Sequence, residues 1–186
     1  MKYSIFLVSF LLVSSLYAQN KETSRFSINP KIGKQYDVNT GIGTTYGLTL
    51  NLFSPKIVYS AGYFNTVETM LFGDTDPKET LNDISLMFGR YFGERFFRIE
   101  GQFGLSLLWG QNRGEKYYQY NYGYRYEVEK FTTVGIPLKM GFKYMPFKFM
   151  SVGIDLQANL NLVRSFFVTF ISLEFGIIRN EVKSRP

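Results

Sequence analysis

The sequence has 186 residues and a formal net charge of +6 at pH 7, and it contains neither cysteine nor histidine. Those two absences exclude disulfides, thiolate nucleophiles, Cys/His zinc sites and catalytic triads built on histidine. Because 45% of the residues are hydrophobic, 18% aromatic and only 19% charged, we expect an ordered chain that folds as one domain.

The first 18 residues have the pattern of a secretory signal peptide. Lys2 supplies a positive charge, an apolar run follows from Ile5 to Leu16, and Ala18 offers a cleavage position. This run is too short to span a bilayer as a helix, and no later stretch approaches the ~20 apolar residues that a spanning helix requires. We therefore predict an exported protein whose mature domain, residues 19–186, does not use helices to enter a membrane.

Eight segments of the mature chain alternate between apolar and polar residues, which is the two-residue period of a β-strand with one apolar face. The alternation is strictest in VGIDLQANLNL, residues 152–162, where Leu156 and Leu160 share one parity and Asp155 and Asn159 the other. In chain order, the predicted strands cover residues 25–35, 41–53, 56–69, 82–92, 96–109, 132–144, 152–162 and 166–177.

The connections between these segments alternate in length. Those after the second, fourth and sixth strands are the short sequences SPK, GER and PFK, whereas those after the first, third and fifth are longer. The short connection at Arg164 and Ser165 departs from this pattern. Short turns at one end and longer loops at the other are typical of bacterial outer-membrane barrels, in which the short turns face the periplasm.

The two faces of the predicted strands differ in chemistry. The polar face is mostly Gly, Ser, Thr, Asn and Gln, which suits the narrow interior of an eight-stranded barrel better than a water-exposed surface. The other face is bulky and apolar, with Arg90 as the charge that it carries. Aromatic residues on that face gather near the strand ends, as in the belts of membrane barrels. They are Tyr59, Phe92, Phe97, Trp109, Tyr144, Phe167 and Phe175.

These patterns predict an all-β fold, an eight-stranded antiparallel up-and-down transmembrane β-barrel. We expect it in the outer membrane, in contact with membrane lipids that include lipopolysaccharide. A one-residue slip of a strand would turn its polar side chains to lipid, where an Arg or Lys near the midplane costs about 2–4 kcal/mol. A soluble periplasmic lipid-binding barrel, with its apolar face inward, is the less favoured alternative.

The block VGIPLKMGFKYMPFKFMSVGIDLQANLNL, residues 134–162, resembles the small outer-membrane β-barrel domain proteins of Gram-negative bacteria, including the PorT-like proteins. In layout the resemblance extends over the whole mature chain. It implies a barrel fold and does not specify an activity.

A set of charged residues falls on the polar face, toward the periplasmic half of the predicted lumen. They are Lys31, Arg98, Glu100, Lys139, Lys143, Asp155 and Glu174. Since an unpaired charge in a narrow interior is strongly destabilising, we expect them to meet as a mixed-sign network that closes the barrel. The alternative is a carboxylate pair, Glu100 with Glu174, that acts as acid and base.

The sequence YYQYNYGYRY, residues 117–126, follows the fifth predicted strand. Five of its tyrosines alternate strictly, namely Tyr118, Tyr120, Tyr122, Tyr124 and Tyr126. We expect them to extend two strands beyond the membrane as a hairpin with its tip at Asn121–Gly123. Its cations are Arg113, Lys116, Arg125 and Lys130. This surface is either a solvated β-rich extension or a contact for lipopolysaccharide, glycan or a protein partner through edge addition.

No cofactor, metal or nucleic-acid partner is expected, and the absence of histidine argues against the lipid-modifying and proteolytic activities of outer-membrane enzymes of this size. Eight strands also leave no open aqueous channel. The first functional hypothesis is therefore a non-enzymatic barrel with a structural or binding role through its extracellular loops. The second is an accessory component of a secretion or envelope-assembly machine, docked through its loops or its basic tail at Arg179, Lys183 and Arg185.

Overall fold

The computed structural model describes residues 25–37, 41–68, 79–93, 95–119 and 123–178, so the predicted signal peptide lies outside the described residues. Eight strands form the regular structure of this part of the chain: β1 (Arg25–Asp37), β2 (Gly41–Ser54), β3 (Ile57–Glu68), β4 (Thr80–Phe92), β5 (Phe97–Gln119), β6 (Gly123–Tyr144), β7 (Met150–Asn161) and β8 (Phe166–Gly176). No described segment forms a helix that is long and apolar enough to cross a membrane.

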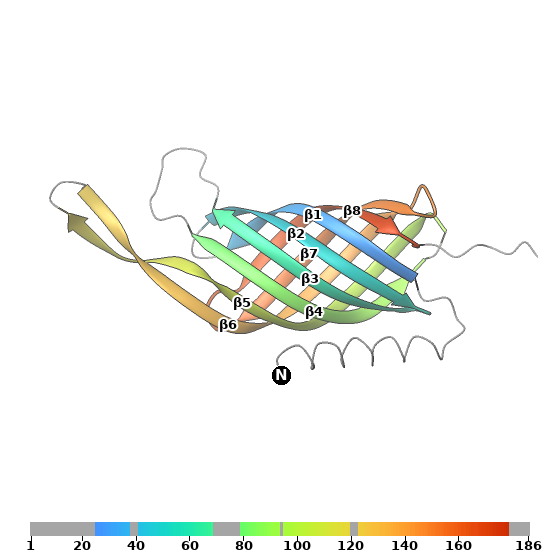
Figure 1. Cartoon of the computed structure of the whole chain (residues 1–186), viewed down its shortest axis with the longest axis horizontal. Helices are drawn as coiled ribbons and strands as arrows, with labels where there is room; N and C mark the ends of the chain where they lie inside the picture. The colour runs from blue at the N-terminus through green and yellow to red at the C-terminus, as the bar shows by residue number, and fades with distance from the viewer. Residues whose placement is uncertain (1–24, 38–40, 69–78, 94, 120–122, 179–186) are drawn as a thin grey trace, which may run out of the picture.

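The eight strands close into a barrel in which every strand is antiparallel to the next and β1 pairs with β8. The strands run obliquely around the barrel wall (Figure 1), as closure of a sheet requires. The predicted eight-stranded antiparallel up-and-down barrel is therefore confirmed, with each predicted strand found at its place in the chain.

The apolar parity of each strand faces outward and the polar parity faces inward. In β7, Leu156 is 40% exposed and Leu160 is 51% exposed, whereas Asp155 and Asn159 are fully buried. Arg90 is exposed on the outer face of β4, as its parity predicts. A soluble carrier with an apolar lumen needs the reverse orientation, so the structure contradicts that alternative.

Aromatic side chains gather near both ends of the outer surface. At the end with the β2–β3, β4–β5 and β6–β7 connections, which we call the turn end, Phe97 packs against Phe142 and Tyr144 with ring centroids 5.7 and 5.3 Å apart. Toward the opposite end, Trp109 lies beside Tyr63 at 6.5 Å. Rings of this kind suit the boundary between hydrocarbon and headgroups.

The two ends of the barrel differ chiefly in how far the strands extend beyond the barrel wall. The turn end has connections at 55–56, 93–96 and 145–149, and the other end has connections at 38–40, 69–79, 120–122 and 162–165. As expected from the sequence, the segment after the fifth predicted strand continues β5 and β6, which project beyond the barrel (Figure 1). Aromatic and β-branched residues in this segment favour paired strands over an irregular loop.

Candidate functional site

The seven charged residues that the sequence predicts to face inward all lie in the lumen. Five strands supply them, and each residue is 5% exposed or less. Four are cations and three are carboxylates, namely Lys31, Arg98, Lys139 and Lys143 with Glu100, Asp155 and Glu174. We call this set the lumen network.

Each carboxylate of the lumen network contacts at least one cation. Asp155 lies 2.7 Å from the ammonium groups of both Lys31 and Lys143. Glu100 lies 2.7 Å from Lys139 and 3.4 Å from the guanidinium of Arg98. Because Lys31 stands on β1 and Asp155 on β7, which share no ladder, their pair connects parts of the wall that backbone hydrogen bonds do not join.

Arg98 links Glu100 to the third carboxylate, Glu174, to which it also donates a hydrogen bond. Glu174 accepts further hydrogen bonds from Ser151 at 2.8 Å and Asn51 at 3.1 Å. Both carboxylates are therefore occupied by partners and shielded from solvent. This arrangement favours a structural plug over an acid–base pair, because a catalytic carboxyl group must reach the proton that it transfers.

Gly141 on β6 provides the room in which two carboxylate side chains of the lumen network pass each other. A Cβ atom at this position would lie 2.7 Å from the Asp155 Oδ1 atom and 2.7 Å from the Glu100 Cγ atom. We expect Gly141→Ala to lower the free energy of unfolding by about 1–3 kcal/mol, the usual cost of overpacking. Chemical unfolding in detergent measures this difference.

Gly101→Ala is the matched control for this change. Gly101 lies on the outer face of β5, and a Cβ atom there meets nothing within 4 Å. Equal stability losses in the Gly141 and Gly101 variants would show that crowding in the lumen network is not the cause.

An apolar cluster fills the lumen next to the lumen network, on the side away from the turn end. It contains Phe64, Leu81, Leu108, Phe166, Val168 and Phe170, with Phe131 packed against it. Lys31 joins the two layers, because its ammonium lies 5.9 and 5.7 Å from the ring centroids of Phe64 and Phe170. The polar parity of the strands predicts small polar residues here, so this apolar layer was not predicted from the sequence.

A second apolar group closes the turn end. Phe53, Val58 and Tyr91 are buried together, with the rings of Phe53 and Tyr91 edge to face at 5.6 Å. The guanidinium of Arg98 lies 4.5 Å from the Phe53 ring centroid, and that of Arg25 lies 5.4 Å from the Tyr91 ring centroid. Side chains therefore fill the lumen in successive layers, as expected for a barrel of eight strands.

A further charged cluster, which strand alternation does not predict, lies at the mouth opposite the turn end. Arg164, in the β7–β8 connection, pairs with Asp37 and, at 2.8 Å, with Glu79. Arg113 of β5 pairs with Glu68 at the end of β3. The Arg113–Glu68 pair ties the projecting part of β5 to the barrel mouth.

The tyrosine-rich segment forms a two-stranded projection, which we call the hairpin. In its ladder Tyr118 pairs with Tyr124 and Tyr117 pairs with Arg125, and the register shifts between Arg113 and Lys116. Tyr120 and Tyr122, with most of the predicted tip Asn121–Gly123, lie outside the described residues.

Side chains near the base of the hairpin make its surface mixed in charge. The guanidinium of Arg113 lies 5.7 Å from the ring centroid of Tyr126, and Tyr117 is exposed. Glu115, Glu127 and Glu129 alternate with the predicted cations along the same two strands, and all three are exposed. The surface is therefore aromatic but less basic than the tyrosine run and its nearest cations suggested.

No protein-family model and no curated protein matches the sequence. Solved structures do match. The attachment invasion locus protein Ail of Yersinia pestis aligns at a TM-score of 0.54 and 10% identity, over 82% of this chain and 97% of Ail. The N-terminal β-barrel domain of Pseudomonas aeruginosa OprF aligns at 0.57 and 13% identity, over 83% and 99%. A major outer membrane protein from Thermus thermophilus aligns at 0.58 and 10% identity, over 83% and 99%.

The fold is that of the small outer-membrane β-barrels. An outer-membrane location also explains the apolar outer surface and its two groups of rings, which would be unfavourable in water. In bacterial barrels of this type the short turns face the periplasm, and the hairpin of this barrel lies at the end opposite its turn end.

Proposed function

We propose that the protein is a non-enzymatic outer-membrane barrel that binds a protein partner outside the cell through the edge of its hairpin. The lumen supports a non-enzymatic role, because the lumen network and the two apolar layers occupy it with mutually paired side chains. The same filling leaves the outward surfaces as the places where a partner can bind.

The free edge of β6 is the observation that carries this proposal. The pairing of β6 with β7 begins at Gly135, so the described residues from Val128 to Thr133 have ladder partners in β5 alone. Their other edge offers backbone N–H and C=O groups to an added strand. Val128, 43% exposed in this stretch, supplies an apolar contact.

Glycan and lipopolysaccharide binding is the less favoured reading of the same surface. A structure of Ail of Yersinia pestis in complex with the heparin analogue sucrose octasulfate matches this chain at a TM-score of 0.55 and 10% identity. On this hairpin, however, Asn112 pairs with Glu129, and Glu127 lies beside Val128. Carboxylates at these positions oppose the binding of a polyanion.

In-cell photo-crosslinking tests the proposal. A photoreactive residue at Val128 should capture a protein, whereas the same residue at lipid-facing Leu107 of β5 should capture lipid only. Absence of protein adducts at Val128 above the level at Leu107 would refute partner binding at this edge.

A narrower proposal is that the partner is a component of a secretion or envelope-assembly machine. The free β6 edge supports it as a docking surface, while the basic tail at Arg179, Lys183 and Arg185 lies outside the described residues. Purification of the cross-linked protein separates the readings, since such a component brings down a large envelope complex and a solitary barrel does not.

A further inference from the structure

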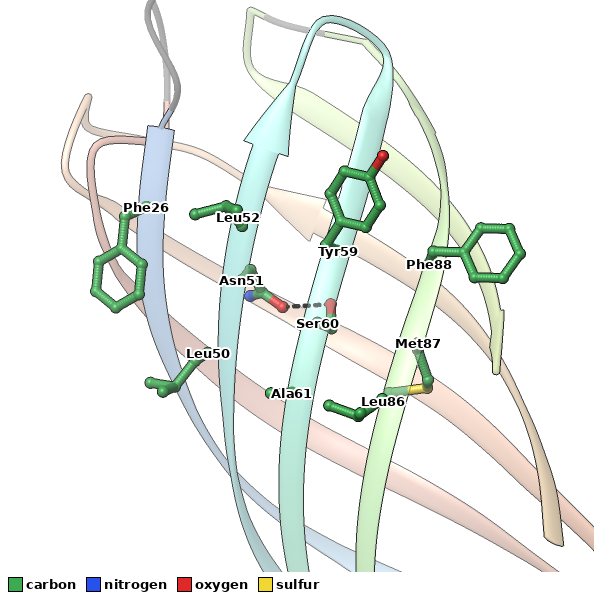
Figure 2. A pocket seen from close by; sticks show the side chains of 10 residues that line it. All are labelled: Phe26, Leu50, Asn51, Leu52, Tyr59, Ser60, Ala61, Leu86, Met87 and Phe88. Atoms are coloured by element: carbon green, nitrogen blue, oxygen red, sulfur yellow. Dashed lines mark hydrogen bonds between the residues drawn. The ribbon is translucent and has the colours of Figure 1, made fainter. Parts of the chain in front are cut away.

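A groove of about 700 Å³ lies on the outer surface of the barrel, across β1 to β4. Its outward-facing lining residues are Phe26, Leu50, Leu52, Tyr59, Ala61, Leu86 and Phe88. Figure 2 shows the rings of Phe26, Tyr59 and Phe88 around it. The groove is therefore apolar and opens toward the membrane.

The small side chain of Ala61 creates this depression. In the strand register, Ala61 lies between Leu50 on β2 and Leu86 on β4. One step toward the turn end, Tyr59 lies between Leu52 and Phe88. A single methyl group between larger side chains leaves space that an adjacent hydrocarbon chain can fill.

Beneath the wall residues Leu50, Tyr59 and Ala61, the inward-facing side chains hold the strands in place. Ser60 donates a hydrogen bond of 2.8 Å to the Asn51 Oδ1 atom, drawn as a dashed line in Figure 2. Asn51 in turn donates to Glu174 of the lumen network at 3.1 Å. The groove is thus part of a rigid wall, which lowers the entropy cost of binding.

Two cations lie at the end of the groove that faces the periplasm. Arg90 is exposed on the outer face of β4, two residues and so about 7 Å beyond Phe88. It pairs in the ladder with Ile57, next to the exposed Lys56 of the β2–β3 turn. Neither side chain has an ion-pair partner among the described residues. Figure 2 shows the Tyr59 hydroxyl directed toward the same turn.

We propose that this groove binds a glycerophospholipid of the periplasmic leaflet. One acyl chain lies over Ala61 between Leu50 and Leu86, and the phosphate contacts Arg90 and Lys56. One lipid then matches both the apolar depression and the two cations, because its hydrocarbon fills the depression and its phosphate pairs with the cations at the membrane boundary.

A second copy of the barrel is a poorer occupant of the same surface. No carboxylate among the described residues of the membrane-spanning wall faces outward, so a symmetric contact would enclose Arg90 without a partner of opposite charge. Burying a charge in that way is costly. A phospholipid carries the missing anion.

Native mass spectrometry of the folded barrel with defined lipids tests this site. In phosphatidylglycerol, the unmodified chain should retain one lipid after activation that strips the others. Ala61→Phe, which fills the groove, and Arg90→Gln, which removes the cation, should each weaken retention about tenfold, the loss expected for one charge-assisted or well-packed contact. Ala158→Phe is the matched control, because Ala158 also lies between larger residues, Leu138 and Phe167, but on β6 to β8.

Each outcome decides the proposal. Equal retention by all four proteins would show unspecific annular lipid and overturn it. Equal retention of a phosphate-free diacylglycerol would overturn the role of Arg90 and Lys56. A dimer that Ala61→Phe dissociates would show that a second copy occupies the groove. Arg90→Gln lies on the surface, so it keeps the test valid if Ala61→Phe does not fold.

Discussion

Replacing Asp155 with asparagine is expected to lower the free energy of unfolding of the barrel by about 3–5 kcal/mol, the usual cost of removing one partner of a buried ion pair. Asp155 is fully buried, and its carboxylate lies 2.7 Å from the ammonium groups of both Lys31 and Lys143. The variant keeps the shape of the side chain but leaves two buried cations without their closest anion. Urea unfolding in detergent or lipid, followed by the fluorescence of the single tryptophan, Trp109, measures the loss.

Gln157→Met is the matched control for this experiment. Gln157 is buried on the same face of β7, two residues along, and its Oε1 atom has no hydrogen-bond partner in the part of the chain that the structure describes. Its replacement should therefore change stability by about 1 kcal/mol or less. Adding Lys31→Met to the Asp155→Asn variant should restore part of the loss, because one unpaired cation is removed. A loss no larger than that of the control would show that the lumen network does not stabilise the barrel.

A charged residue introduced on the lipid-facing surface should also destabilise the folded barrel strongly. Leu156 lies near the middle of β7 and faces outward. We expect Leu156→Arg to cost about 2–4 kcal/mol, the range for Arg near the membrane midplane. Folding into lipid vesicles, read from the migration of unheated samples on gels, should show a corresponding fall in the folded fraction as urea is added.

Leu162→Arg provides the comparison within the same segment. Leu162 follows β7 and is fully exposed at the hairpin end. There the same substitution should cost about 0–1 kcal/mol, because the arginine can reach the interface. Equal effects at Leu156 and Leu162 would contradict the membrane placement of β7.

The strand pattern could be read from the sequence because lipid and lumen act on alternate residues. Hydrocarbon selects Leu156 and Leu160 on one side of β7, while the crowded interior selects Asp155 and Asn159 on the other. The same selection allowed the seven members of the lumen network to be assigned to the interior. Their individual partners required the structure, since parity does not say which strands face each other across the lumen.

The inward-facing aromatic residues could not be predicted from strand alternation. Phe64 and Phe170 stand on the polar parity, yet their ring centroids lie 5.3 Å apart in the lumen. An aromatic residue on the polar parity is an exception to strand alternation. Its partner across the lumen cannot be predicted from the pattern either, because β3 and β8 are not neighbours in the ladder. Arg164 lies in the short β7–β8 connection, as the sequence predicts, but its ion pairs with Asp37 and Glu79 became known only from the structure.

The sequence by itself determined the number of strands, their direction and the face that each side chain presents, because these depend on local alternation and on the solvent that each face meets. Only the tertiary structure decided the layered filling of the lumen, the partners within the lumen network and the groove over Ala61. Each of these depends on contacts between residues distant in the chain, which form when the barrel closes and sets the register of all eight strands together.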